Sequence, residues 1–360
     1  MKKIFALATA LLAVFTLVSC ARKETADEFG WYSDFNAAKK LAQKDNKSII
    51  LYFSALDSDG KSADLNDKIF KTTEFKEKFS PEYVFCNIDF SSSRFDNVYL
   101  NKEPDSENFS DEENDEQSSK KSTRSAKETS RLQEKLSRDM LLPSYYAVEA
   151  FPAVFVLTKQ GYVISPLLLE EGYDIDDAQA ELEKSAGRKS QITNLLTTIY
   201  SGNKEEALKA IDELYNTTED EYKFLLEDLH EKYISLDKDN KSGGTVDHIF
   251  ELANARAQKA FFENDYEKAV SELESPLKYK VLTPENRLQA YYSVGYFLAM
   301  SGSTDYDRII DYFQKAYDSA PESEYAPALQ QMIGNLNEMK SEQGYAPEEA
   351  ATSASESKSE

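Results

Sequence analysis

The sequence is poor in the side chains that most often carry out redox, metal-dependent or nucleophilic chemistry. Of its 360 residues, only two are cysteine and two are histidine. His230 and His248 lie in helical stretches, and no cluster of cysteines or carboxylates gives them metal-ligand spacing. No nucleophile-elbow motif supports a Ser-His-Asp arrangement, and the segment DSDGKS lacks the upstream glycine of a phosphate-binding loop. We therefore expect no metal and no cofactor.

Positive charge is scarce as well. The chain has 42 Lys and Arg against 65 Asp and Glu, a formal net charge of -23. Contacts to nucleic-acid phosphates need cations that are not outnumbered by carboxylates, so we expect no nucleic-acid partner. The length allows two domains, each with a core of its own.

Long apolar runs are missing after residue 20, but the first twenty residues contain one. In MKKIFALATALLAVFTLVSC, two lysines precede an apolar run from Ile4 to Val18 that is short for a membrane span and suits a signal-peptide core. The run ends in LVSC, which resembles the lipobox of bacterial lipoproteins. This resemblance implies that residues 1–19 are a signal peptide and that Cys20 becomes a lipidated N-terminus with acyl chains such as palmitate. The alternatives are an ordinary secretory signal or an uncleaved anchor, with an accidental cysteine.

The lipobox resemblance also predicts a location. Residues 20–30 would form a lipidated tether, and the protein would be exported and anchored to a bacterial membrane, at the periplasmic face or the cell surface. Cys86 would then be the one remaining thiol of the mature chain, so no intramolecular disulfide could form.

Residues 31–186 alternate between helical and strand patterns, which predicts an α/β sandwich with a mixed sheet. The predicted elements are a helix beginning at Trp31, a buried strand at 48–53, a helix from the following loop to Phe79, a strand at 83–90, a helix around 132–140, a hairpin of strands at 153–157 and 162–164, and a helix at 176–186.

Composition changes sharply inside this domain. From about residue 91 to 130 the chain is polar, with eight carboxylates between Glu103 and Glu116 followed by serines and basic residues. Such a segment has too little apolar surface to offset the entropy of ordering it, so we predict a disordered insertion. Its acidic and basic halves could also pair with each other or recruit a partner.

Several features of this domain occur in the order found in one family. They are Trp31, the strand SIILYF, the loop FSALDSDGKSADL, the helix KIFKTTEFKEKF, the segment YAVEAFPAVFVL and Gly161. On these features the domain resembles the thioredoxin-like superfamily, over residues 31–90 and 131–185. In redox-active members the loop carries a Trp-Cys-x-x-Cys motif. The resemblance aligns its cysteines with Asp59 and Ser62 and its tryptophan with Ser58.

The resemblance therefore implies a degenerate active-site loop, Asp59-Gly60-Lys61-Ser62. Thiol–disulfide exchange needs a thiolate at the helix N-terminus and a second thiol, and a carboxylate and a hydroxyl supply neither. Asp59 can cap the helix instead. We expect no catalytic residue and no enzymatic activity. The rival hypothesis is thiol–disulfide exchange through Cys86 or a partner's thiols, although a small buried hydrophobe is the commoner role of such a cysteine.

Phe151-Pro152 corresponds, within the resemblance, to the cis-proline junction that faces the family's active loop. Most bonds before proline are trans, but the family context leads us to expect a cis bond here. A groove between Asp59 and Pro152 would then be available to an extended peptide, through strand-like hydrogen bonds. Alternatively, the proline only preserves the fold.

From residue 187 to about 340, strand patterns disappear and helical stretches follow one another through short turns. The segments SGNKEEALKAIDEL, ENDYEKAVSELESP and STDYDRIIDYFQKAYDSAP share a polar turn followed by an amphipathic helix. The region resembles degenerate tetratricopeptide repeats, which bind proteins on concave surfaces. In the third segment Gly295 fits the small first-helix position, and Ile309, Phe313, Ala316 and Pro321 keep the second-helix spacing.

The aromatic residues of this region leave two interpretations open. We interpret Tyr291, Tyr292, Tyr296 and Phe297 as core residues, with a ligand-binding role as the alternative. Residues 341–360 are rich in Glu, Ser and Ala and are predicted to be a disordered tail. The whole sequence predicts a membrane-anchored lipoprotein that binds a protein partner in the cell envelope without catalysis. The alternative is a purely structural envelope component.

Overall fold

The computed structural model describes residues 25–94 and 115–343, without the side chains of residues 115–129 and 343. Residues 1–24, with Cys20 and the predicted signal peptide, lie outside this part. So do residues 95–114 of the predicted insertion and residues 344–360 of the predicted tail. Among the described helices, none combines the length and the apolar composition that a membrane crossing requires.

The chain forms two compact units. The first runs to Met140 and resumes at Glu149–Ala186, and the second joins Leu141–Val148 to the residues from Gly187 onward. Residues 141–148 thus group with the later helices, whereas the sequence analysis places them in the domain 31–186.

The packing of Tyr145 gives the physical reason for this difference. Its ring centroid lies 5.8 Å from that of Phe224 and 5.8 Å from that of Phe262, both in the second unit. Burial and the carboxylate of Glu263 raise the pKa of Tyr145 to about 12, so this phenol stays neutral.

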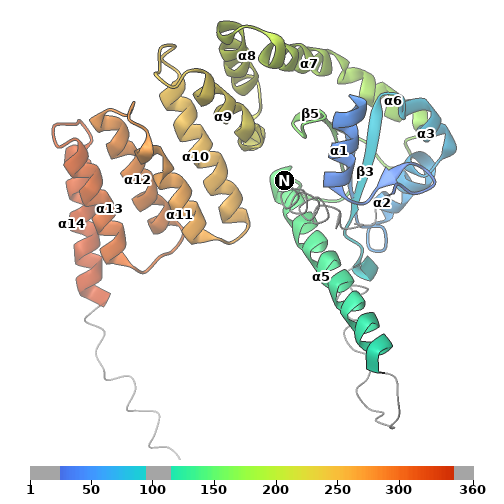
Figure 1. Cartoon of the computed structure of the whole chain (residues 1–360), viewed down its shortest axis with the longest axis horizontal. Coiled ribbons are helices and arrows are strands. Elements are labelled where there is room, and N and C mark those ends of the chain that lie inside the picture. Colours follow the sequence, from blue (N-terminus) through green and yellow to red (C-terminus); the bar gives the residue numbers. More distant parts are fainter. Residues whose placement is uncertain (1–24, 95–114, 344–360) are drawn as a thin grey trace, which may run out of the picture. The chain divides into compact units, whose positions relative to one another are not determined.

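The first unit is built on a five-stranded mixed sheet in the order β1-β3-β2-β4-β5 (Figure 1). Strands β1, β3 and β2 are parallel, β4 is antiparallel to β2, and β5 is antiparallel to β4. This confirms the predicted mixed sheet, and the order and directions are those of the thioredoxin-like fold. The strands are β1 (Trp31–Tyr32), β2 (Ser48–Ser54), β3 (Tyr83–Asp89), β4 (Ala153–Leu157) and β5 (Val163–Leu167).

The central strand β2 is apolar because both of its faces are covered. Its residues from Ile49 to Ser54 are all buried, as the near-continuous apolar run predicts. Helix α1 (Phe35–Asp45) packs against β2 and β3, and α6 (Ile175–Lys184) ends the unit.

Two predicted helix boundaries in this unit are wrong. Trp31 begins strand β1, and α1 starts only at Phe35, because the Asp34 side chain caps it by accepting a 2.8 Å hydrogen bond from the Ala37 N–H. The helix predicted from the loop to Phe79 is three pieces: α2 (Gly60–Leu65), a π-helical turn η1 (Asn66–Phe70) and α3 (Thr73–Phe79).

The break before α3 has a local cause. Thr72 has an extended backbone, and its Oγ1 accepts a 3.2 Å hydrogen bond from the Phe75 N–H, which makes it the N-cap of a new helix. The apolar spacing continues across the break, so the pattern by itself does not reveal it.

A cluster of aromatic side chains packs β1 against η1, α3 and β3. The Trp31 ring centroid lies 5.1 Å from that of Phe70, 5.2 Å from Phe85 and 5.9 Å from Phe75. The Trp31 Nε1–H donates a 2.8 Å hydrogen bond to the Phe70 carbonyl, so the buried indole has a polar partner.

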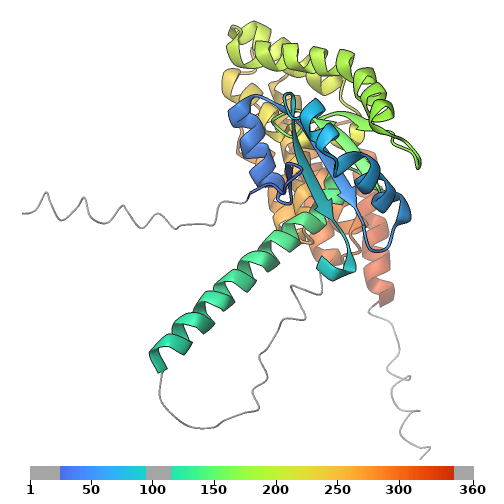
Figure 2. The same ribbon diagram turned by 90° about the vertical axis from the view of Figure 1, so that its right-hand side faces the viewer.

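Helix α5 (Asp115–Tyr145) is longer than predicted (Figure 2). The sequence analysis predicts disorder to about residue 130, whereas the backbone is helical from Asp115. Residues 116–142 contain neither glycine nor proline and are rich in Lys, Arg, Glu and Gln, which have high helix propensity. Low apolar content excludes a packed core for this stretch but does not exclude a helix.

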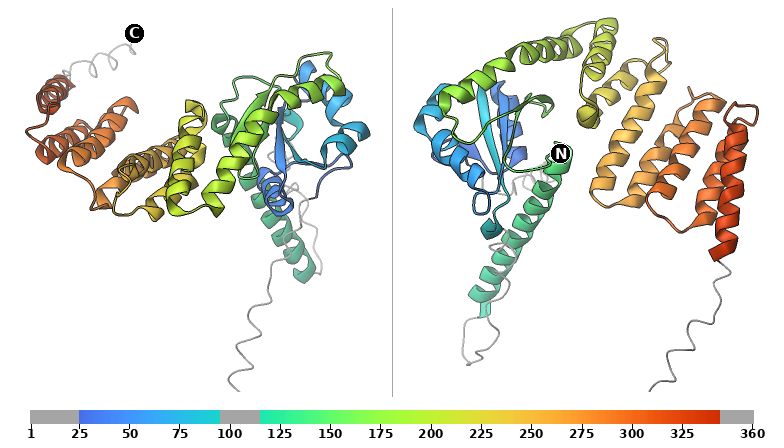
Figure 3. Two further views of the ribbon diagram at one scale, coloured as in Figure 1. Left: turned by 90° about the horizontal axis from the view of Figure 1, so that it is seen from above. Right: turned by 180° about the vertical axis from the view of Figure 1, so that it is seen from behind.

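The described residues of the second unit contain helices and turns and no strand, which confirms the predicted all-α region. Figure 3 shows α10 to α14 following one another as antiparallel helices. The elements are α7 (Ala186–Ser201), α8 (Lys204–Asn216), η2 (Asp220–Leu226), α9 (Glu227–Leu236), α10 (Thr245–Phe262), α11 (Tyr266–Glu274), η3 (Ser275–Lys278), α12 (Pro284–Met300), α13 (Tyr306–Ser319) and α14 (Ala326–Gln343).

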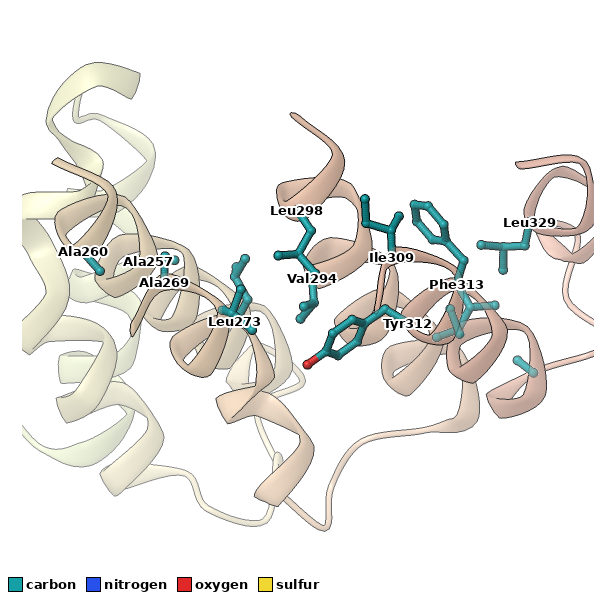
Figure 4. Packing of buried hydrophobic residues seen from close by; sticks show 14 residues of the cluster. Ala257, Ala260, Ala269, Leu273, Val294, Leu298, Ile309, Tyr312, Phe313 and Leu329 are labelled. Atoms are coloured by element: carbon teal, nitrogen blue, oxygen red, sulfur yellow. The ribbon is translucent and has the colours of Figure 1, made fainter. Parts of the chain in front are cut away.

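One large core cluster fills the space among α10 to α14 (Figure 4). Gly295 of α12 lies close to α13, because a Cβ added there would lie 2.8 Å from Cε1 of Phe313. Ile309, Phe313 and Ala316 are all buried in this cluster, in agreement with the small-residue and apolar positions assigned to them.

Candidate functional site

The degenerate loop begins where β2 ends and leads into α2. Asp59 has an extended backbone and is the N-cap of α2. Its Oδ2 accepts a 2.7 Å hydrogen bond from the Ser62 N–H and a 2.6 Å hydrogen bond from the Ser62 hydroxyl. The predicted capping role of Asp59 therefore agrees with the geometry, and the two side chains aligned with the family's thiols bind each other.

Ser62 is held by the surrounding backbone as well. Its side chain is fully buried, its Oγ accepts a 3.2 Å hydrogen bond from the Ala55 N–H, and its carbonyl accepts a 2.8 Å hydrogen bond from the Tyr52 hydroxyl. Burial raises the pKa of Tyr52 well above its ordinary value, so the phenol stays protonated as a donor. Gly60 is exposed and Lys61 is half-buried.

Asp89, at the end of β3, organises the other side of the loop. Its Oδ1 accepts hydrogen bonds from the Ser54 hydroxyl (3.1 Å), the Leu56 N–H (3.2 Å) and the Ser91 hydroxyl (2.8 Å). The sequence analysis did not assign this role. The available signal was a carboxylate at the end of a parallel strand beside β2, at the same edge of the sheet as the loop.

The Phe151-Pro152 bond is cis, as predicted. Ala153 pairs with Phe53 in the antiparallel β2–β4 ladder, so the register places Pro152 beside the end of β2, where the loop begins. Phe151 stacks on Phe90, with ring centroids 5.0 Å apart. The loop and the proline junction thus share one edge of the sheet, and within the described part of the chain no hydrogen bond joins Asp59 to Pro152.

Cys86 lies in the middle of β3. It pairs with Leu51 of β2 and with Tyr32 of β1, and its side chain is fully buried. A thiolate nucleophile needs access to its substrate and stabilisation of its charge, and a buried apolar position disfavours both.

The second unit has an open apolar pocket of about 470 Å³ between α10, α11 and α12. Phe261, Tyr296 and Met300 line it and expose 43%, 48% and 69% of their surface. The Phe261 ring makes an edge contact with the Phe297 ring, with centroids 6.3 Å apart. An exposed apolar concavity of this kind is typical of a binding site.

The four aromatic residues assigned to the core divide between two roles. Tyr291, Tyr292 and Phe297 pack partly buried against the core cluster, as expected. Tyr292, Tyr296 and Phe297 also line the pocket. Tyr296 is largely exposed, so the ligand-binding alternative fits it better than the core interpretation.

Two amide side chains on α10 also line the pocket, and the sequence did not identify them. Asn254 and Gln258 line its edge, four residues apart on one helix face and both exposed. The signal for these residues was the helical spacing of 254, 257, 258 and 261, with polar and apolar side chains together on one exposed face.

No cluster of three or more His, Cys, Asp or Glu suited to a metal ion occurs among the described side chains, in residues 25–94 and 130–342. The two histidines do meet in the core of the second unit, although their spacing gave no metal signature. His230 Nδ1 and His248 Nδ1 lie 2.7 Å apart, and both side chains are buried.

Comparison with known proteins gives two similarities. The TP_0391_C family model, described as "Uncharacterised protein C-terminal domain", matches residues 245–342, which begin at the first residue of α10. A solved structure titled "DsbH Oxidoreductase" is similar with a TM-score of 0.29 and 18% sequence identity, over 50% of this chain and 98% of that chain. No curated protein matches the chain. The family match lies within the second unit and contains the residues that line the aromatic pocket.

Proposed function

We propose that the protein is a lipid-anchored envelope protein that binds an extended segment of a partner protein without catalysis. The observation that carries this proposal is the pocket of α10 to α12, where Phe261, Tyr296 and Met300 leave large apolar surfaces in contact with water. Burying such surface lowers the free energy by about 25 cal/mol per Å² of apolar area, so the pocket favours binding of an apolar side chain.

The polar edge of the pocket favours a peptide as the ligand. Asn254 and Gln258 stand one helical turn apart, about 6 Å along the axis. This spacing approaches the repeat of two residues in an extended chain, about 6.6 Å. The two amides can therefore bind main-chain groups two residues apart in a peptide, while an apolar side chain of the same peptide enters the pocket.

The first unit supports the non-catalytic part of the proposal. Asp59 and Ser62 bind each other and cap α2, so the helix N-terminus is already occupied by protein groups. The rival redox hypothesis uses either Cys86, which has no exposed surface, or the thiols of a partner. The membrane anchor through Cys20 rests on the lipobox resemblance in the sequence.

Site-specific photo-crosslinking in native cells tests where a partner binds. A crosslinking residue at Gln258 reports on the pocket, one at Ala150 reports on the proline junction, and one at Gln330 of α14 is an exposed control. We expect a discrete adduct from position 258 and none from position 330. Adducts from position 150 alone would show that the partner binds the thioredoxin-like groove instead of the pocket. Equal adduct yields at all three positions would favour a purely structural role.

A pair of matched variants sharpens this test. Phe261→Ser with Tyr296→Ser should abolish the adduct from position 258. Tyr200→Ser with Tyr325→Ser removes two aromatic side chains that are 53% and 61% exposed elsewhere, and it should leave the adduct unchanged. Equal loss in both variants would contradict a specific pocket.

Two biochemical assays test the remaining parts. Insulin reduction by the wild type should not exceed that of Cys86→Ser, with a redox-active thioredoxin as the positive control. Turnover above the Cys86→Ser level would establish the redox alternative.

Globomycin should block processing of the precursor, and Cys20→Ser should abolish incorporation of labelled palmitate. Normal processing and membrane release under globomycin would overturn the lipid anchor.

A further inference from the structure

A second cleft of the helical unit differs from the aromatic pocket in its charge. It lies between α9, α10 and η3 and has a volume of about 470 Å³. Its floor is apolar, formed by Ile234, Leu252 and Tyr279, of which the first two belong to one buried cluster packed against the third. Its rim carries Lys238, Arg256 and Lys278. Three cations thus gather around an apolar surface in a chain whose net charge is -23.

The charges of the rim are not equally available. Arg256 donates a 2.9 Å hydrogen bond from Nε to Glu227 and forms an ion pair with Glu231, the one carboxylate that lines the cleft. These two pairings occupy Arg256 and compensate Glu231. The positive charge that remains for a ligand is therefore that of the two lysines.

Lys238 and Lys278 come from different elements. Both are exposed, and neither forms an ion pair within the described residues. The Lys278 Nζ lies 5.2 Å from the centroid of the Tyr279 ring, so one cation stands directly beside the apolar floor. A ligand with a negative group and an apolar body would meet a complementary surface for each part.

We propose that this cleft binds a small organic carboxylate, with its apolar body on Ile234, Leu252 and Tyr279 and its carboxylate between Lys238 and Lys278. The volume is that of a small-molecule site, since such sites typically enclose about 300–1,000 Å³. The acidic surface of the rest of the chain repels anions, so the two lysines confine the carboxylate to this cleft. This site is independent of the peptide pocket of α10 to α12.

Isothermal titration calorimetry with 4-phenylbutyrate tests the proposal, because this probe joins one carboxylate to one apolar body. We expect the full chain to bind 4-phenylbutyrate, to bind the uncharged 4-phenylbutanamide about tenfold more weakly, and to show no binding of inorganic phosphate at the same concentrations. Equal affinity for the acid and the amide would overturn the role of the lysines, and absence of binding would overturn the site.

Variants that change charge by the same amount locate the binding. Lys238→Gln with Lys278→Gln should weaken 4-phenylbutyrate binding about tenfold. Lys241→Gln with Lys280→Gln removes two neighbouring lysines that do not line the cleft, and it should leave the affinity unchanged. Equal weakening in both would show a general charge effect and overturn the site. Phe261→Ser with Tyr296→Ser should also leave this binding unchanged, which separates failure here from failure of the peptide pocket.

Discussion

His230 and His248 share a hydrogen bond between their Nδ1 atoms, 2.7 Å apart, in the interior of the helical unit. The Nε2 of His248 lies 2.9 Å from Oδ1 of Asp212, and the Tyr233 ring stacks on His248 with centroids 3.7 Å apart. If the His248 Nε2–H donates to Asp212, its Nδ1 accepts from the Nδ1–H of His230. This chain of donors is complete with both imidazoles neutral.

The histidine pair predicts that stability falls in mild acid. Burial, with the neighbouring His248, lowers the pKa of His230 from 6.5 to about 3. The folded state therefore binds fewer protons than the unfolded state between these values, and the stabilisation is complete above pH 6.5 and lost as pH falls toward 3. We expect the free energy of unfolding to be about 2 kcal/mol lower at pH 5 than at pH 7, measured by urea denaturation.

His230→Asn is the control for this prediction. The asparagine amide can donate to His248 Nδ1 but cannot be protonated in this range. The variant should lose most of the difference in stability between pH 7 and pH 5. The same pH dependence in the variant and the wild type would assign the effect to other groups.

Substitution by alanine should change the stability in opposite directions at two glycines in helix interiors. Gly295→Ala should destabilise the helical unit by about 1–3 kcal/mol, because the new Cβ would meet the buried Phe313 ring at 2.8 Å. Gly334→Ala in α14 has no atom within 4 Å and should stabilise by up to about 1 kcal/mol through helix propensity. Urea midpoints of the two variants give the comparison, and equal shifts would contradict the close approach of α12 to α13.

Removing the N-cap of α2 should lower the stability of the protein moderately. Asp59→Ala removes the acceptor for the Ser62 N–H and hydroxyl and should lower the free energy of unfolding by about 1 kcal/mol. Asp59→Ser keeps a capping oxygen and should recover most of that loss. If the serine variant is as unstable as the alanine variant, capping is not what Asp59 contributes.

Asp237 should contribute far more to the stability of the helical unit than Asp239 does. Hydrogen bonds from the Ser242 hydroxyl and N–H, at 2.6 and 2.8 Å, hold the pKa of Asp237 well below its ordinary range, and Lys204 pairs with it at 2.9 Å. Asp237→Asn should cost roughly 2 kcal/mol through weakened hydrogen bonds. Asp239→Asn, whose side chain is 78% exposed, should change stability by less than about 0.5 kcal/mol. Thermal unfolding of both variants checks this contrast.

The features that the sequence predicts well depend on local chemistry. Asp59 could be identified as a cap because an aspartate preceding a helix satisfies free N–H groups wherever the helix lies. The all-helical second unit was predictable because short turns separate segments of helical periodicity. Pro152 was predictable only through the family resemblance, since an isolated proline favours the trans bond.

The features that the sequence does not predict arise from packing between distant segments. His230 and His248 meet because α9 and α10 are neighbours, and the two lysines line one cleft because η3 packs against α10. The break at Thr72 was missed because apolar spacing continues across it. The length of α5 is not predicted because low hydrophobicity favours disorder, whereas helix propensity, which does not depend on a core, favours a helix from Asp115.

The assignment of Leu141–Val148 to the helical unit has a consequence for how this protein can be divided. The chain passes between the two units three times, at residues 140/141, 148/149 and 186/187. Neither unit is therefore a single continuous gene segment, and no single cut or fusion point exchanges one of them intact. The stretch matched by the family model, residues 245–342, starts after all three crossings. It is thus a portion of the helical unit that recombination could transfer as one piece.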